Sequence, residues 1–204
     1  MSKVAKFVVI INDNVFWMED KAVQFYTNLF KEKELGEKYA EEHLSKKELF
    51  RIQNDFSIEI LMAYLDETPQ SYLKLDSSRI LNENLGVSKA INLSEIVYFD
   101  EEDLKALIKR AEEIAFQRKH DLIWVKAFAV DTALIAILRS LNYEEFDMEE
   151  TVEDQFPKRI YFRKKIINPI DVQSISSSFF KWGFIISYTI LIMCIIDLGR
   201  NALS

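Results

Sequence analysis

Residues that usually build metal centres and phosphate loops are scarce in this sequence. Its 204 residues include 4 glycines, 3 prolines, 2 histidines and 1 cysteine. The single cysteine, Cys194, excludes an internal disulfide and any cysteine-based metal cluster. His43 and His120 are far apart in the chain, so the sequence gives little support to a metal site. No glycine occurs between Gly86 and Gly183, which excludes a glycine-rich phosphate loop from that stretch.

Acidic residues outnumber basic ones, with 33 Asp and Glu against 26 Lys and Arg. The formal net charge is −7 at pH 7, and no basic stripe exists that could neutralise nucleic-acid phosphates, so we expect no nucleic-acid partner. The charged residues near the C-terminus cancel, which places the acidity in the preceding domain: they are Asp171, Lys181, Asp197 and Arg200. The apolar run Phe7–Ile11 is too short for a signal peptide. We therefore expect a domain that faces the cytoplasm.

The most informative stretch that is present is a strand leading directly into a helix. Ser94–Phe99 ends in a continuous run of β-branched and aromatic residues, which is typical of a buried strand. Apolar residues then recur at three- and four-residue steps over Asp100–Ala115, which predicts an amphipathic helix. Asp100 is the expected N-cap, and Glu101–Asp103 fill the first turn. Such a junction often holds a phosphate, but these carboxylates would satisfy the free N–H groups and repel a pyrophosphate.

Hydrophobic periodicity and turn residues predict the other elements of the N-terminal half. They are a strand at Val4–Ile11, a turn at Asn12–Asn14, a helix from Asp20 to about Lys33, a helix at Leu35–Leu44, a helix from Ser45, and a strand at Phe56–Leu65. Asp20 is the expected N-cap of the first helix, and Ser45 would form a capping box with Glu48. We expect the aromatic residues of these helices to lie in the core.

The same signals predict the elements of the C-terminal half around the central strand and helix. They are a turn at Asp66–Gln70, a strand at Ser71–Leu75, an exposed connection at Asp76–Asn92, a strand at Leu122–Phe128, a helix between Asp131 and Asn142, and strands at Tyr143–Met148 and Arg159–Lys165. Pro69 would supply the fixed φ of the turn, and Asn142 is suited to a left-handed helix end. The predicted order is therefore β-α-α-α-β-β-β-α-β-α-β-β.

Five short segments, taken in their order along the chain, resemble segments of a known protein family. They are Phe25–Phe30, Ser71–Leu75, Glu95–Phe99, Ile123–Val125 and Asp131–Tyr143. Their order and spacing resemble the GNAT superfamily of N-acetyltransferases, over roughly residues 4 to 166. The resemblance implies an α+β fold with a mixed, mostly antiparallel central sheet flanked by helices. It also implies that residues 1–167 form one GNAT-like domain.

The resemblance further implies an activity, a cofactor and site residues. The activity is transfer of an acetyl group from acetyl-CoA to an amine, either a small amine or a peptide N-terminus. Glu95 is the candidate general base near the acceptor amine, although a lone glutamate on a strand edge also has a purely structural interpretation. The resemblance places cofactor binding at Val97, Tyr98, Phe99 and Asp131.

The sequence departs from the family pattern at the positions that carry chemistry. Asp100–Asp103 stands where the family has a glycine-containing pyrophosphate loop, Gln/Arg-x-x-Gly-x-Gly/Ala. Leu138 occupies the position of a tyrosine that often acts as general acid, and leucine cannot donate a proton. Asp131 replaces an asparagine and Asn142 a glycine. We therefore expect acetyl-CoA binding to be weak or lost. The alternative to a divergent enzyme is a pseudoenzyme, a non-catalytic binding or regulatory module.

The last part of the chain differs from the rest in composition. Residues 168–178 are interpreted as a linker and residues 179–204 as a hydrophobic tail, expected to form a helix. Trp182–Ile196 carries no charge and, with Phe179 and Phe180, approaches the minimum length of a membrane span. Basic residues precede it, which would put the domain on the cytoplasmic side: they are Lys158, Arg159, Arg163, Lys164 and Lys165. The alternatives are docking on the domain, docking on a second subunit in a homodimer, and an extension outside the family domain.

Overall fold

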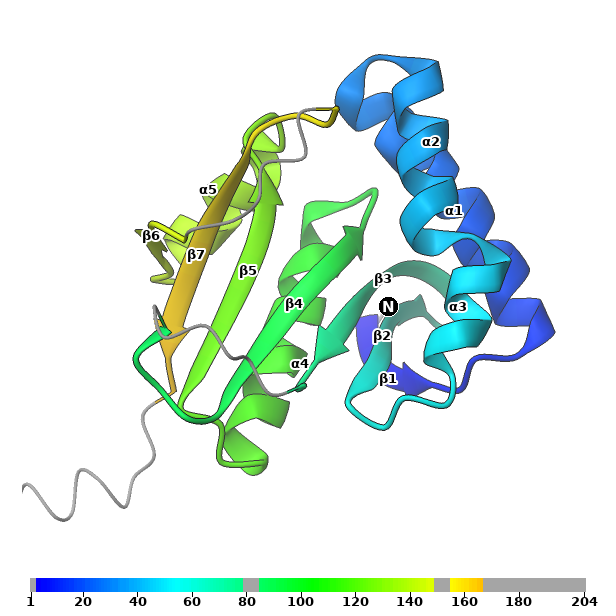
Figure 1. Ribbon diagram of the computed structural model, residues 1–204. Coiled ribbons are helices and arrows are strands. Elements are labelled where there is room, and N and C mark those ends of the chain that lie inside the picture. The colour runs from blue at the N-terminus through cyan, green and yellow to red at the C-terminus, as the bar shows by residue number, and fades with distance from the viewer. Residues whose placement is uncertain (1–2, 79–84, 149–154, 167–204) are drawn as a thin grey trace, which may run out of the picture. The chain divides into compact units, whose positions relative to one another are not determined.

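A computed structural model describes residues 3–78, 85–148 and 155–166 (Figure 1). Within these ranges seven strands form one sheet of order β1-β2-β3-β4-β5-β7-β6. The strands are β1 (Lys3–Val8), β2 (Ile58–Leu65), β3 (Thr68–Asp76), β4 (Ala90–Val97), β5 (Leu122–Phe128), β6 (Glu144–Phe146) and β7 (Arg159–Lys165). The helices are α1 (Asn12–Phe30), α2 (Lys33–Leu44), α3 (Lys46–Ile52), α4 (Glu101–Gln117) and α5 (Thr132–Ser140). β4 and β5 are parallel and the other neighbouring strands antiparallel, so the predicted order and mixed sheet are confirmed.

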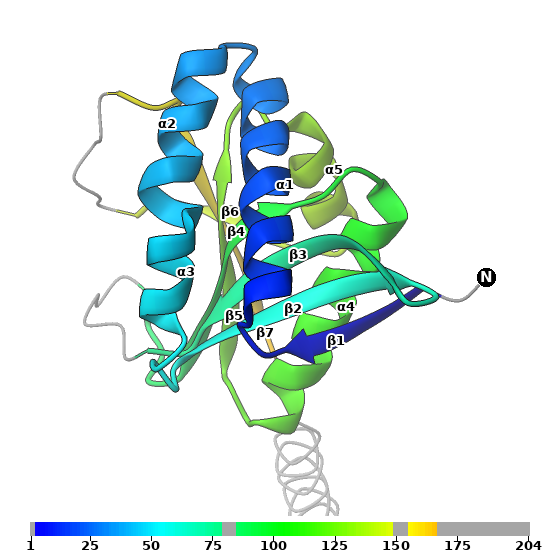
Figure 2. The same cartoon turned by 90° about the vertical axis from the view of Figure 1, so that its right-hand side faces the viewer.

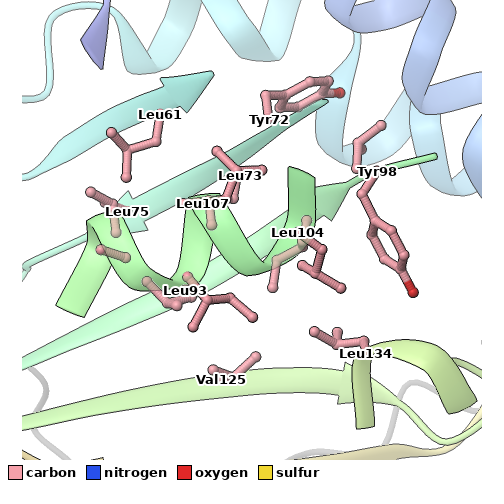
Figure 3. Packing of buried hydrophobic residues seen from close by; sticks show 14 of the residues in the cluster. Leu61, Tyr72, Leu73, Leu75, Leu93, Tyr98, Leu104, Leu107, Val125 and Leu134 are labelled. Atoms are coloured by element: carbon pink, nitrogen blue, oxygen red, sulfur yellow. The ribbon is translucent and has the colours of Figure 1, made fainter. Parts of the chain in front are cut away.

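The sheet lies between two layers of helices. Helices α1, α2 and α3 cover one face, and α4 and α5 cover the other (Figure 2). The stripe of α4 is buried against the sheet as its spacing predicts, and Leu104 and Leu107 meet the central strands (Figure 3). Each such leucine contributes about 1.5–3 kcal/mol when it leaves water. On this face the core therefore lies between α4 and the central strands, and the same buried cluster continues into α1, α2 and α3 on the other face.

Helices α1 and α2 approach each other closely at Gly36. A Cβ atom at this position would lie 2.4 Å from the Cα and the backbone nitrogen of Thr27. Because the neighbouring atoms belong to the backbone, no rotamer change could make room for a side chain. Glycine at this position therefore lets α1 and α2 pack backbone to backbone.

The start of α1 differs from the prediction. The helix begins at Asn12, so the predicted turn at Asn12–Asn14 and the predicted N-cap at Asp20 are both wrong. Val15 and Met18 are fully buried and extend the apolar stripe toward the N-terminus. The Asn14 side chain donates to the carbonyl of Val9 at 2.9 Å. Asparagine and aspartate make such local bonds to the backbone at helix starts as well as in turns.

Local bonding also departs from expectation at the start of α3. The Ser45 side chain makes no capping hydrogen bond, so the capping box is not formed. Glu48 instead pairs with Arg51 at 2.6 Å. The backbone N–H of Lys46 donates to Glu19 of α1 at 3.0 Å, so a tertiary contact satisfies one of the free N–H groups at the start of α3.

Two strands are longer than predicted. β3 begins at Thr68, so Pro69 lies within the strand, and Asp66 at φ 57° makes the tight turn. The pairing shifts between Ala63 and Tyr64, next to the partner of Pro69, and such irregularities accommodate a residue without an N–H group. β4 begins at Ala90 rather than at Ser94, because parallel pairing with β5 starts there. It ends at Val97, so the predicted strand end at Phe99 is wrong.

The helix ends near the second half of the sheet follow the prediction. Asp100 caps α4 by accepting the N–H groups of Glu102 and Asp103 at 2.8 and 3.3 Å. Asn142 has φ 63° just after α5. The predicted linker and the tail helix lie outside the described residues. Among the helices within those ranges, none combines the length and apolar character that a bilayer crossing needs.

Candidate active site

Glu95 lies in a bulge of β4. Between two neighbouring β3–β4 pairs, β3 has one residue, Leu73, where β4 has two, Glu95 and Ile96. Glu95 has φ 49°, in the left-handed region that residues other than glycine rarely adopt. Bulges bend a strand and re-aim its side chains. The bulge turns the Glu95 side chain toward α1 and α2, where its hydrogen-bond partners lie.

Two tyrosine hydroxyls hold the Glu95 carboxylate. Tyr26 of α1 and Tyr39 of α2 both donate to Oε2, at 3.3 and 3.1 Å. Both tyrosines are buried. Burial, together with the nearby Glu95 charge, raises the pKa of Tyr26 well above its ordinary value. Tyr26 therefore stays a hydrogen-bond donor to the carboxylate at any physiological pH.

A gap separates the C-terminal halves of β4 and β5. The parallel pairing covers four residue pairs and ends at Leu93 and Val125. Beyond that point Ser94–Ile96 of β4 and Lys126–Phe128 of β5 line a cavity of about 30 Å³, large enough for one or two water molecules. Glu95 is the carboxylate on the β4 side of this cavity.

Aromatic rings form the wall of the cavity on the α1–α2 side. The ring of Tyr39 lies 4.4 Å from Tyr26 and 5.2 Å from Phe128, and Phe30 lies 4.9 Å from Phe128. The Arg159 guanidinium of β7 stands over Phe128 and Tyr39, at 5.2 and 5.9 Å from the ring centres. This wall is therefore largely apolar, while the charged residues that line the cavity are Glu95, Asp131, Lys126 and Arg159.

Tyr98 and Asp131 join the end of β4 to the start of α5. The Tyr98 hydroxyl donates to Oδ1 of Asp131, and the same atom accepts the backbone N–H of Leu134 at 3.0 Å, which caps α5. Burial raises the pKa of Asp131, although both hydrogen bonds act in the opposite direction. This clasp ties the residue that follows β4 to the N-cap of α5.

The start of α4 is occupied by the protein's own charges. Lys3 of β1 places its ammonium 2.7 Å from Asp100, 3.0 Å from Asp103 and 3.7 Å from Glu102. The Lys3 ammonium lowers the pKa of Asp100, and the carboxylates raise that of Lys3. Asp103 is buried and also accepts from Ser71 at 3.4 Å. Two N–H groups of the first turn are already bonded to Asp100, so little donor capacity remains for an outside anion.

Comparison with known proteins identifies the overall fold. No protein-family model matches the sequence, and neither does any curated protein. Solved structures do match. PaiA N-acetyltransferase from Thermoplasma acidophilum, solved with coenzyme A, has a TM-score of 0.62 at 15% identity, covering 81% of this chain and 99% of that one. The GNAT fold is present.

Two further structures with the GNAT fold agree. A GNAT-family acetyltransferase from Staphylococcus aureus Mu50 has a TM-score of 0.56 at 11% identity, covering 80% of this chain and all of that one. Aminoglycoside 6'-acetyltransferase type Ii has a TM-score of 0.51 at 13% identity and covers 80% and 97%. The resemblance predicted from five short segments is therefore confirmed at the level of the fold.

The predicted site residues occupy different places in this GNAT fold. Glu95 and Asp131 both line the cavity. Val97 is buried in the core beside it, and Tyr98 takes part in the clasp with Asp131. Phe99 is partly exposed and packs near Phe25, with ring centres 6.2 Å apart. The structure thus brings Glu95 and Asp131 to one cavity and places the others around its edge.

The site has members that the sequence did not reveal. Tyr26 and Tyr39 follow a helical apolar pattern, and their hydroxyl bonds to Glu95 span 69 and 56 residues of sequence. Lys3 reaches Asp100 across 97 residues. Arg159 was expected only as part of a basic cluster. No local signal identifies such contacts. Leu138 is fully buried, so its position in α5 faces the core. No cluster of three metal-ligating side chains occurs in the part of the chain that the structure describes.

Proposed function

We propose that the protein transfers an acetyl group from acetyl-CoA to an amine, and that it holds the cofactor weakly. The observation that carries the proposal is the Glu95 carboxylate, held by two tyrosine hydroxyls beside a gap between parallel strands. The fold neighbours support it, because they are acetyltransferases and one was solved with coenzyme A. The aminoglycoside 6'-acetyltransferase supports an amine acceptor.

The residues around the gap between β4 and β5 fit the pantetheine arm of acetyl-CoA, whereas the start of α4 does not fit its pyrophosphate. Ser94–Ile96 and Lys126–Phe128 face each other without pairing to one another, so their backbone groups suit the amides of a thin pantetheine arm. The start of α4 does not suit a pyrophosphate, because Asp100 takes its N–H groups and Glu101–Asp103 add negative charge. Bound acetyl-CoA would supply the activated acetyl thioester. The poor fit at α4 is the reason to expect weak affinity.

The chain's own residues have defined tasks in this proposal. An ammonium group is not a nucleophile, so the acceptor must lose a proton, and Glu95 is the carboxylate placed to accept it. Tyr26 and Tyr39 fix the orientation of Glu95 by donating to one oxygen, which leaves Oε1 for the acceptor. The surrounding rings exclude bulk water, which strengthens the electrostatic attraction between Glu95 and an ammonium group.

The test combines cofactor binding with activity of the full chain. Calorimetric titration should detect acetyl-CoA binding, and thiol release with a panel of amines should detect transfer. Glu95→Gln should lower the transfer rate by about 10²- to 10⁴-fold, the usual contribution of a general base, while leaving acetyl-CoA binding unchanged. Glu67→Gln in the β2–β3 turn is the matched control and should leave both unchanged. Acetyl-CoA binding without any transfer, or transfer that survives Glu95→Gln, would contradict the assignment of Glu95.

A non-catalytic GNAT-fold module is the second candidate. It is favoured by the Lys3–Asp100–Asp103 cluster at α4 and by the buried Leu138. A folded full chain that gives no heat with acetyl-CoA at several temperatures would support this candidate and reject the first. Under either candidate, we propose that residues 179–204 tether the domain to the cytoplasmic face of a membrane. Release of the chain by salt washing alone would argue against that tether.

A further inference from the structure

The end of β1, the starts of β2, β4 and β5 and the end of β7 lie at the same end of the sheet, and the chain leaves the domain there. The last residue of β1, Val8, pairs with Ile60 near the start of β2. At the same end β4 and β5 begin side by side, and Leu122 at the start of β5 pairs with Lys165 at the end of β7. The N–H of Ile166 donates to Asp121 at 2.9 Å. The domain therefore ends on the same side as the end of β1 and the start of α1 (Figure 2).

Exposed apolar side chains gather around this end of the sheet. Phe56 in the α3–β2 connection is 100% exposed, and Val9 after β1 is 71% exposed. Ile11 at the start of α1, Phe7 near the end of β1 and Phe116 in the last turn of α4 are about half exposed. We call these five residues the apolar end. Scattered exposed apolar residues are common, but a group of this kind at one end of a domain marks an interaction site.

Hydrogen bonds hold the apolar end in place. Asp55 accepts the N–H and the hydroxyl of Ser57 at 2.9 and 2.6 Å, and this turn fixes the loop that presents Phe56. The Gln53 side chain donates to the carbonyl of Ile10 at 3.0 Å, which joins the loop to the Val9–Ile11 segment. A fixed loop with a fully exposed phenylalanine is suited to inserting that side chain into an apolar environment outside the domain.

A further contact extends the apolar end toward α4. The Arg118 guanidinium stands 5.2 Å from the ring centre of Phe7 and pairs with Glu59 of β2. This arrangement connects the end of α4, which carries Phe116, to the end of β1. Lys89 and Lys119 are exposed at the same end, before β4 and after α4, and could meet anionic headgroups.

We propose that the apolar end rests on a lipid membrane, with Phe56 inserted among the headgroups and upper acyl chains. The chain leaves the domain at Ile166 on this side and continues, after residues 167–178, into an apolar tail. Trp182–Ile196 contains no charged residue, so its sequence offers no polar face to turn toward water. A one-sided patch could cover only part of such a segment, whereas lipid can surround it. The membrane is therefore the occupant that accounts for both the tail and the apolar end.

The test uses the full chain with one environment-sensitive fluorophore. A Cys194→Ser background with Phe56→Cys carries the label at the apolar end, and Glu67→Cys carries it at the opposite end of the sheet as the matched control. Phe56 is fully exposed, so its replacement should leave the fold intact. The labelled chains are mixed with vesicles of phosphatidylcholine and phosphatidylglycerol. A second vesicle preparation contains a spin-labelled lipid as quencher.

The expected result is a blue shift at position 56 with vesicles and quenching by the spin-labelled lipid, with neither effect at position 67. A chain that floats with vesicles while the label at 56 stays in water would overturn the proposal, because the domain would then hang free of the surface. The proposal would also be overturned if the label at position 56 emitted at shorter wavelength than the label at position 67 when no lipid is present. Concentration dependence of that shift would identify a second copy as the occupant, and its absence would identify the chain's own tail. Failure to float would reject membrane contact altogether.

Discussion

The Lys3 cluster at the start of α4 gives a prediction whose size follows from burial. Lys3 contacts Asp100 and Asp103, and the Asp103 side chain is only 4% exposed. In a Lys3→Met variant the Asp103 carboxylate would stay buried, with the Ser71 hydroxyl at 3.4 Å as a weak partner. A buried charged group that loses its partner costs about 1–3 kcal/mol or more. The Asp100 side chain is 54% exposed, so its share is about 0–1 kcal/mol.

The two contributions sum to a loss of about 1–4 kcal/mol in the free energy of unfolding for Lys3→Met. Urea unfolding of the full chain measures this loss. Lys109→Met on the exposed side of α4 is the control and should change stability by less than about 0.5 kcal/mol. Asp103→Asn combined with Lys3→Met should recover much of the loss, because the amide carries no charge to be left unpaired. A loss below about 0.5 kcal/mol for Lys3→Met would refute the reasoning.

The same variant should show a defined pH dependence. Lys3 lowers the pKa of Asp100 from its ordinary value of 3.8, so Asp100 contributes stability above that value and loses the contribution as the pH falls through the lowered pKa. The part of this contribution that comes from Lys3 is absent in Lys3→Met, whereas the part from the N–H groups of Glu102 and Asp103 remains. The stability difference between the native chain and the variant should therefore shrink as the pH falls below about 4.

Two further predictions concern other close contacts. Gly36→Ala should destabilise the chain by roughly 1–3 kcal/mol in urea unfolding, because the added Cβ would meet the Thr27 backbone at 2.4 Å; unchanged stability would show that α1 and α2 are free to separate. Asp131→Asn keeps the acceptor for Leu134 and removes the charge. Because burial raises the pKa of Asp131 above 3.8, the native chain loses stability as the pH rises through the raised pKa, and the variant does not. The thermal midpoint of Asp131→Asn should therefore gain on that of the native chain as the pH rises above about 4, and parallel curves would count against a raised pKa.

The order of elements could be predicted from the sequence because most elements carry their own signals. The α4 stripe and its Asp100 cap are local, as is the left-handed Asn142, and all three were predicted correctly. The errors arose where tertiary contacts override local preference. Asn12–Asn14 resembles a turn, but burial of Val15 extends α1 over it. Pro69 resembles a turn residue, but the shifted β2–β3 pairing accepts it within a strand.

The candidate site was only partly predictable for a related reason. Glu95 was named as a candidate from the family resemblance, but its left-handed conformation depends on the bulge opposite Leu73. Its tyrosine partners come from two helices, and nothing in a helical apolar pattern distinguishes a core tyrosine from one that bonds a carboxylate. Contacts of this kind depend on how α1 and α2 pack on the sheet, which the sequence pattern does not encode locally.

The close contact at Gly36 also has a kinetic consequence. Since α1 and α2 pack backbone to backbone, and each contributes one tyrosine to Glu95, the two helices form a single rigid cover over the carboxylate. Moving this cover away from β4 would break both hydrogen bonds in one event rather than in two independent steps. The Oε1 atom of Glu95 stays available throughout, but the rate at which Oε2 loses its two donors would then equal the opening rate of a helix pair. That is a motion of microseconds to milliseconds, much slower than the rotation of a side chain.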